Sequence, residues 1–279
     1  RAAAPIFSPI CGRTRMKAGW ITVGLCRIGL RPDTTARRSG QPGETGGRAA
    51  RFGQTSQVPQ RLIGGAITPT EDAMADQDRP QITLITPPAF DWEVFPDTLA
   101  RVLDAAEIAC LRLPLAGSDE LELSRMADAA RLVAHARDVA VVIETHLGLV
   151  ERLGLDGVHL ADGARSVRKA RKDLGADAIV GAYCGATRHE GISAGEAGAD
   201  YVAFGPVGAT PLGDGALAGR ALFQWWSEMI EVPVIAEGGL TLALVEELLP
   251  VTDFFGIGAE IWRADDPASA LKTLMAPLG

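Results

Sequence analysis

Cysteine is scarce in this sequence, and its spacing excludes two common uses of the residue. The 279 residues contain four cysteines, at Cys11, Cys26, Cys110 and Cys184, and no two of them form a CxxC pair. Neither a zinc module nor a disulfide framework is therefore indicated. The sequence also lacks an HExxH motif, so nothing in it predicts a zinc site. We expect a reducing, cytoplasmic location.

The sequence also has fewer basic than acidic residues and lacks long apolar runs. There are 27 Lys and Arg against 35 Asp and Glu, a formal net charge of −8. Affinity for nucleic acid comes largely from neutralising phosphates, so we expect no nucleic-acid partner. The best apolar stretch, residues 18–26, ends at Arg27, well short of the roughly 18 residues that a membrane span needs. We therefore expect a soluble protein without a membrane partner.

The charge is divided unevenly along the chain. Residues 1–73 carry 11 Lys and Arg against 4 Asp and Glu, together with 11 Gly and 6 Pro. They show no helical or alternating apolar period, which predicts a disordered extension. An Arg-rich, acid-poor leader also resembles an organelle transit peptide or, from Met16, a weak secretion signal. We favour a third interpretation, in which translation begins at Met74 and residues 1–73 are a non-native leader.

From residue 80 onward, short apolar runs alternate with segments of helical period. Eight runs are predicted strands: 81–86, 108–113, 139–144, 156–160, 177–182, 200–205, 232–237 and 253–258. A predicted helix follows each strand, within 98–107, 119–136, 145–154, 164–175, 188–198, 219–230, 241–250 and 267–279. Eight such units predict a single (β/α)8 TIM barrel of the α/β class over residues 80–279. No GxGxxG follows the first strand, which disfavours a dinucleotide-binding sheet.

Glycine-rich segments follow the last two predicted strands, where a barrel of this kind forms its active site. Gly238 and Gly239 follow the seventh strand, and Gly258 and Ala259 lie at the end of the eighth. These loops often bind phosphate through backbone N–H groups, and glycine lets an anion approach the backbone closely. We therefore predict phosphate binding at these four residues. A simple turn into the next helix is the alternative interpretation of Gly238 and Gly239.

The four histidines have different expected roles. His135 lies within a predicted helix and is expected to pack there or lie on its surface. His159 lies within a predicted strand, where a hydrogen-bonded core residue is expected. His146 and His189 follow the third and fifth strands, where they could either reach the active site or begin a helix.

Four segments, in this order and spacing, resemble thiamine phosphate synthase and its thiazole tautomerase relatives. They are GLDGVHL (154–160), GADYVAFGPVGAT (198–210), PVIAEGGL (233–240) and GIGAEI (256–261). The resemblance implies a TIM barrel that joins an aminopyrimidine methyl diphosphate to a thiazole phosphate, releases diphosphate and uses Mg²⁺. It also implies that Gly205 and Thr210 contribute to the thiazole phosphate site. The implied partners are small phosphorylated heterocycles, and a homo-oligomer is left open.

At the diphosphate end the sequence departs from the family's pattern. The family's Gln-x-Arg-x-Lys in the second strand reads CLRLP (110–114) here, so only Arg112 matches. The family's Asn-Asp pair after the third strand reads Glu144-Thr145, and its second metal aspartate is Ala164. Glu144 and Asp162 end adjacent strands and are the candidate replacements, because Mg²⁺ prefers oxygen ligands.

These matches and losses lead to three functional hypotheses. The first is a thiamine phosphate synthase, a transferase whose activity the lost residues could weaken. Its catalytic residues would be Arg112, Glu144 and His146, and its metal ligands would be Glu144 and Asp162. The second is a thiazole tautomerase, which needs a general base, such as His146 or His189, but no diphosphate site. The third is a non-catalytic paralogue that keeps only the phosphate site.

Overall fold

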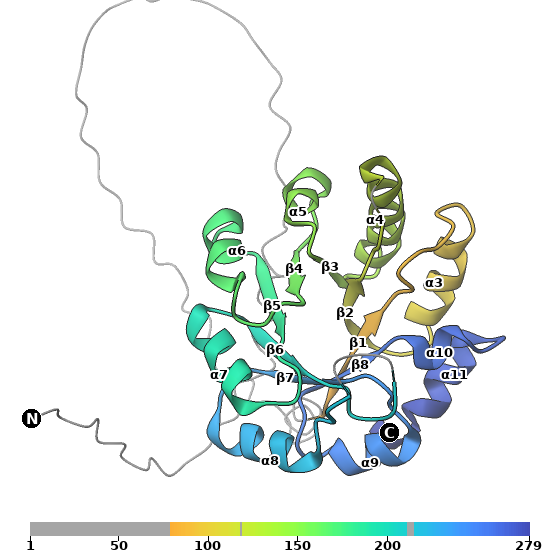
Figure 1. The fold of residues 1–279 in the computed structure, drawn as a ribbon. Helices are drawn as coiled ribbons and strands as arrows, with labels where there is room; N and C mark the ends of the chain where they lie inside the picture. The colour runs from red at the N-terminus through yellow and green to blue at the C-terminus, as the bar shows by residue number, and fades with distance from the viewer. Residues whose placement is uncertain (1–78, 118, 211–214) are drawn as a thin grey trace, which may run out of the picture.

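Eight parallel strands form a closed barrel in their order along the chain, with helices around the outside (Figure 1). The structure is a computed structural model, and it describes residues 79–117, 119–210 and 215–279. The predicted (β/α)8 fold is confirmed. The predicted extension, residues 1–73, lies outside the described residues.

All eight predicted strands are present, and each bound lies within two residues of the prediction. They are β1 (Gln81–Ile85), β2 (Ile108–Leu113), β3 (Ala140–Glu144), β4 (Gly157–Leu160), β5 (Ile179–Tyr183), β6 (Tyr201–Phe204), β7 (Val234–Glu237) and β8 (Phe254–Ile257). Pairing between β8 and β1, from Gln81 opposite Phe254 to Leu84 opposite Ile257, closes the barrel.

A helix follows every strand, as predicted. The helices are α3 (Phe95–Leu103), α4 (Glu120–His135), α5 (Leu147–Leu153), α6 (Val167–Leu174), α7 (Arg188–Ala197), α8 (Arg220–Met229), α9 (Leu242–Leu248), α10 (Ala259–Trp262) and α11 (Pro267–Leu274), with a final 3-10 turn at Ala276–Leu278. Polar side chains fix several starts: the side chain of Asp119, for example, accepts hydrogen bonds from the N–H groups of Leu121 and Glu122, which would otherwise lack a partner in the helix. The four-residue helix α10 was not predicted, since it is too short to show a period.

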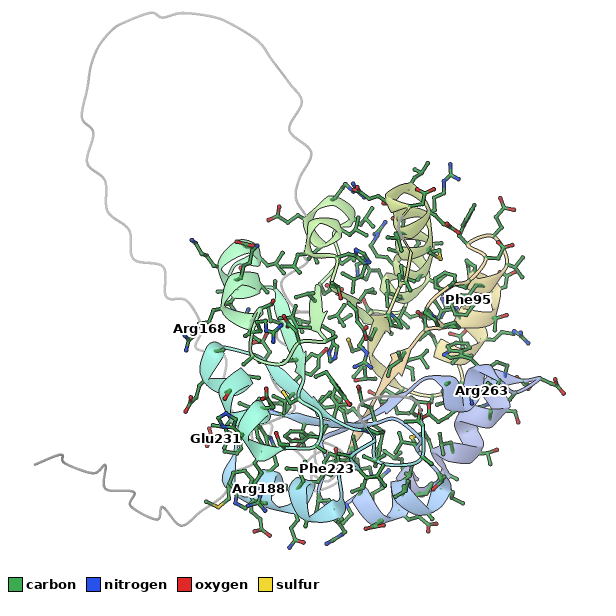
Figure 2. The ribbon with its side chains drawn as sticks, in the orientation of Figure 1. Phe95, Arg168, Arg188, Phe223, Glu231 and Arg263 are labelled. Carbon is green, nitrogen blue, oxygen red and sulfur yellow. The ribbon has the colours of Figure 1, made fainter. Side chains whose placement is uncertain are left out.

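Alternating side chains along the strands divide the core into two parts. In β6, Val202 and Phe204 belong to the large core between strands and helices, whereas Tyr201 and Ala203 belong to a separate cluster. Successive residues in a strand point to opposite sides of the sheet, so this second cluster faces the barrel interior. Phe223, labelled on α8 in Figure 2, is fully buried between α8 and the outer side of the barrel, and its ring centroid lies 5.9 Å from that of Phe204.

Within the described residues, none of the helices has the length and apolar character needed to cross a membrane.

Candidate active site

A buried charged cluster lies inside the barrel around Arg112 of β2. Its Nη1 lies 2.7 Å from Oε2 of Glu237 in β7 and 3.0 Å from Nε2 of His159 in β4. Its Nε lies 3.2 Å from Oε1 of Glu144 at the end of β3. One cation therefore faces two carboxylates and an imidazole from three other strands, and this arrangement could not be read from sequence spacing.

Among the fully buried side-chain nitrogen and oxygen atoms of the described residues, Nε of Arg112 is the one without a hydrogen-bond partner. It forms an ion pair with Glu144, but it is buried and makes no hydrogen bond to any described residue. An unsatisfied buried donor costs free energy. A substrate oxygen or nitrogen that reached this depth could remove that cost.

His159 continues the cluster across the barrel to Tyr201 of β6. Its Nδ1 lies 2.9 Å from the Tyr201 hydroxyl, and both residues are buried. Arginine can only donate, so Nε2 of His159 accepts from Arg112 and its Nδ1–H donates to the Tyr201 oxygen. The expectation of a hydrogen-bonded core histidine at this position is confirmed.

A glycine beside this pair makes room for the tyrosine ring. Gly181 of β5 lies opposite His159 in the strand pairing. A Cβ at Gly181 would lie 2.0 Å from Cζ of Tyr201, far inside van der Waals contact. The absent side chain at Gly181 therefore allows Tyr201 to reach His159.

Burial and neighbouring charges shift the pKa values of the cluster. Burial, reinforced by the charge of Arg112, holds the pKa of His159 well below its ordinary value, so the imidazole is neutral at pH 7. Burial raises the pKa of Glu144; Arg112 opposes that rise and Glu237 adds to it. Burial alone would lower the pKa of Arg112, but Glu237 and Glu144 more than compensate and raise it. By formal charge, two carboxylates and one guanidinium give the cluster a net charge of one negative unit.

The predicted phosphate-binding loops meet at the ends of β7 and β8, and a carboxylate of the chain already contacts them. Oε1 of Glu260 accepts hydrogen bonds from the N–H groups of Gly239 at 2.9 Å and Leu240 at 3.2 Å. Its Oε2 accepts from the N–H of Gly258 at 2.8 Å. Three backbone donors from two loops thus converge on one half-exposed anionic side chain.

Backbone packing holds the first of these loops in place. Gly239 has a φ of 75°, and a Cβ there would lie 2.7 Å from the carbonyl carbon of Gly208, so this position requires glycine. The N–H of Gly208 donates to the carbonyl of Gly238 at 2.9 Å. The loop after β6, which includes Gly205, is thereby attached to the loop after β7.

The remaining predicted site residues lie at the edges of these two regions. His146 precedes α5, with Nε2 3.3 Å from the carbonyl oxygen of Leu115. Asp162 is exposed after β4 and accepts a hydrogen bond from the Ser166 hydroxyl at 2.7 Å. Ala259 is exposed at the start of α10, and Thr210 is half-buried.

Five residues whose polar groups form these two regions had no predicted site role: His159, Tyr201, Glu237, Leu240 and Glu260. One signal for Glu237 is present in the sequence, because an acidic residue that ends an apolar strand of a barrel needs a buried partner. The identity of the partner was not predictable from the sequence. Nothing in the sequence indicated that Glu260 would turn back onto the glycine loops.

The described residues contain no group of three or more His, Cys, Asp or Glu side chains placed to hold a metal ion. The relative position of the two predicted metal ligands, Glu144 and Asp162, follows from strand pairing. Glu144 lies opposite His159, and Asp162 follows His159 by three residues. The two carboxylates therefore belong to the carboxyl ends of neighbouring strands.

Comparisons with known proteins agree on one family. A family model described as thiamine monophosphate synthase matches residues 82–258. A thiamine-phosphate synthase of Rhodospirillum centenum is 40% identical over 194 residues, covering 68% of this chain and 94% of the relative. One from Erythrobacter litoralis is 36% identical, covering 63% and 85%. A solved structure of thiamine phosphate pyrophosphorylase from Pyrococcus furiosus, 19% identical, superimposes with a TM-score of 0.62, covering 71% of this chain and 96% of that one, which supports the fold alone.

Proposed function

The chain belongs to the thiamine monophosphate synthase family, and from that premise we propose that it joins an aminopyrimidine methyl diphosphate to a thiazole phosphate in thiamine biosynthesis. The observation that carries the proposal is the 40% identity to a thiamine-phosphate synthase over 94% of that relative. The described site supports it with a charged cluster inside the barrel and converging backbone donors in the loops after β7 and β8.

The two substrates would occupy different sectors of the barrel mouth. The pyrimidine diphosphate would lie over β2, β3 and β4, where Arg112, Glu144 and Asp162 are found. The thiazole phosphate would lie over β6, β7 and β8, near Gly205, Gly238, Gly239 and Gly258. This division follows the rule that barrel active sites form at the carboxyl ends of the strands.

The reaction breaks the bond between the pyrimidine methylene carbon and the diphosphate oxygen, which leaves with the electron pair. The thiazole nitrogen then donates its lone pair to the methylene carbon. Positive charge develops on the pyrimidine in between, and fixed negative charge stabilises such a transition state. Glu144 and Glu237 supply that charge, held in place by Arg112. The unsatisfied Nε–H of Arg112 is the donor that we assign to a diphosphate oxygen.

Members of this family use Mg²⁺, and the oxygen donors of this sector fit it. Mg²⁺ is commonly held by one or two carboxylates, with substrate phosphates and water as its other ligands. Glu144 and Asp162 would be those carboxylates. When bound, the ion would neutralise charge on the leaving diphosphate.

The test of this proposal compares two isosteric variants in the synthase reaction with Mg²⁺. Glu144→Gln removes a negative charge beside the developing cation, so we expect kcat to fall at least about tenfold. Glu151→Gln makes the same change at an exposed position of α5 and should leave kcat unchanged. Equal kcat values for Glu144→Gln and wild type would remove the charged cluster from the mechanism.

A further inference from the structure

We propose that Glu260 is a specificity-determining residue at the thiazole end of the site. Its carboxylate occupies the anion site formed by the N–H groups of Gly239, Leu240 and Gly258. A substrate phosphate would bind there only by displacing it. This inference rests on the proposed function, because it concerns the phosphate of the thiazole substrate.

The first argument is the direction of the donors. Three N–H groups from two separate loops point at one carboxylate, with distances of 2.8 to 3.2 Å. Converging backbone N–H groups are a general anion-binding arrangement. The glycine required at 239 keeps this backbone bare of side-chain bulk. The donors are therefore suited to an anion, and in this structure that anion is a side chain.

The second argument is competition. A carboxylate and a phosphate would accept hydrogen bonds from the same donors, and two negative charges this close repel each other. Glu260 must leave before phosphate can enter. The side chain is half-exposed, so rotation about its side-chain bonds can take the carboxylate into water, where it is fully solvated.

The third argument is that the exchange leaves no donor unsatisfied. Empty loops would carry three unpaired N–H groups, each costly when removed from water. Glu260 satisfies them before the substrate binds, and phosphate would satisfy them afterwards. The apparent association constant for phosphate is then the intrinsic association constant multiplied by the fraction of molecules in which Glu260 has moved away.

The consequence is a selective effect on anionic ligands. Removing the charge of Glu260 should strengthen binding of a phosphate and leave binding of an uncharged thiazole alcohol unchanged. Glu260 would thus set how strongly the enzyme prefers the phosphorylated thiazole over the unphosphorylated one.

The experiment measures dissociation constants by calorimetry on the full chain, with inorganic phosphate, thiazole phosphate and the thiazole alcohol as ligands. Glu260→Gln keeps the shape of the side chain and one acceptor oxygen. We expect it to bind both phosphates at least about tenfold more tightly than wild type and the alcohol equally well. Glu246→Gln, at an exposed position of α9, is the matched control and should match wild type with all three ligands.

Glu260→Ala provides a second variant, and melting temperatures show whether either variant keeps the fold. Unchanged or weaker phosphate binding in a folded Glu260→Gln or Glu260→Ala protein would overturn the inference. The binding measurement does not depend on turnover. Tighter phosphate binding without formation of thiamine phosphate would leave the inference standing and refute the proposed function, whereas turnover with unchanged phosphate affinity would do the reverse.

Discussion

Arg112 and Glu237 form a buried salt bridge inside the barrel, with Nη1 and Oε2 2.7 Å apart. They are 125 residues apart in sequence, and their exposed fractions are 4% and 1%. A charge so removed from water is tolerated only with its partner present. This pair therefore connects β2 and β7 through the interior, independently of the backbone hydrogen bonds between neighbouring strands.

The first prediction concerns the cost of breaking this pair. Glu237→Gln leaves Arg112 in the barrel with only the more exposed Glu144 as its counter-charge. We expect the free energy of unfolding, measured by urea denaturation, to fall by about 3 kcal/mol. Glu231→Gln, an exposed position labelled at the edge of the molecule in Figure 2, should change it by less than about 0.5 kcal/mol. Similar values for the two variants would mean that the buried pair contributes little to stability.

The second prediction concerns the space at Gly181. A methyl group there overlaps the Tyr201 ring, so Gly181→Ala should reduce the free energy of unfolding by about 1–3 kcal/mol. A methyl group at Gly148 in α5 would meet no neighbouring atom within 4 Å, and Gly148→Ala should stabilise the helix by about 0.5 kcal/mol. Thermal unfolding of the two variants should therefore shift in opposite directions. A Gly181→Ala protein as stable as wild type would contradict the tight fit around Tyr201.

The third prediction follows from the low pKa of His159. The unfolded chain takes up a proton on this residue near its ordinary pKa of 6.5, whereas the folded chain does so only well below that value. The unfolded state binds more protons between the two pKa values, so the contribution of His159 to stability is complete above pH 6.5 and is lost as the pH falls through this range.

The measurement compares urea denaturation of wild type with that of His159→Gln, at pH 7.5 and at a series of lower pH values. The difference between the two unfolding free energies should change by up to about 1.4 kcal/mol per pH unit below pH 6.5. His189→Gln, which makes the same replacement at an exposed position in the first turn of α7, is the matched control. Parallel curves for wild type and His159→Gln would contradict a neutral His159.

The fourth prediction concerns Mg²⁺. An ion held by Glu144 and Asp162 would lie on the diphosphate side, whereas the thiazole phosphate would bind the backbone donors at β7 and β8 that Glu260 vacates. Calorimetry should show that Mg²⁺ tightens binding of the aminopyrimidine diphosphate and scarcely affects the thiazole phosphate. Removing the ion with EDTA should reverse the gain. Equal diphosphate affinity with and without Mg²⁺, unchanged in Glu144→Gln with Asp162→Asn, would refute this metal site.

Most of the fold could be predicted because its signal is local. Each strand is a short apolar run bounded by turn residues, and most helices longer than two turns show an apolar period. The position of the glycine loops followed from the same strand count. Helix α10 lacked such a signal, and so did the bend that brings Glu260 back to Gly239 and Gly258.

The charged cluster was less accessible to sequence reasoning because its members come from different strands. Arg112 and Glu144 were identified as strand-end residues, but their ion pair depends on the closure of the barrel. His159, Tyr201 and Glu237 each lie within or at the end of an apolar run typical of a core strand. Only the three-dimensional arrangement shows that their polar atoms meet.

The most direct test of the central claim is the stoichiometry of the reaction. The purified chain is incubated with the aminopyrimidine methyl diphosphate, the thiazole phosphate and Mg²⁺, and thiamine phosphate and diphosphate are both quantified over time. We predict that the two products appear in equal amounts, that omission of the thiazole phosphate stops thiamine phosphate formation, and that Glu144→Gln slows both products together. Absence of thiamine phosphate under conditions in which the Rhodospirillum centenum relative forms it would contradict the account.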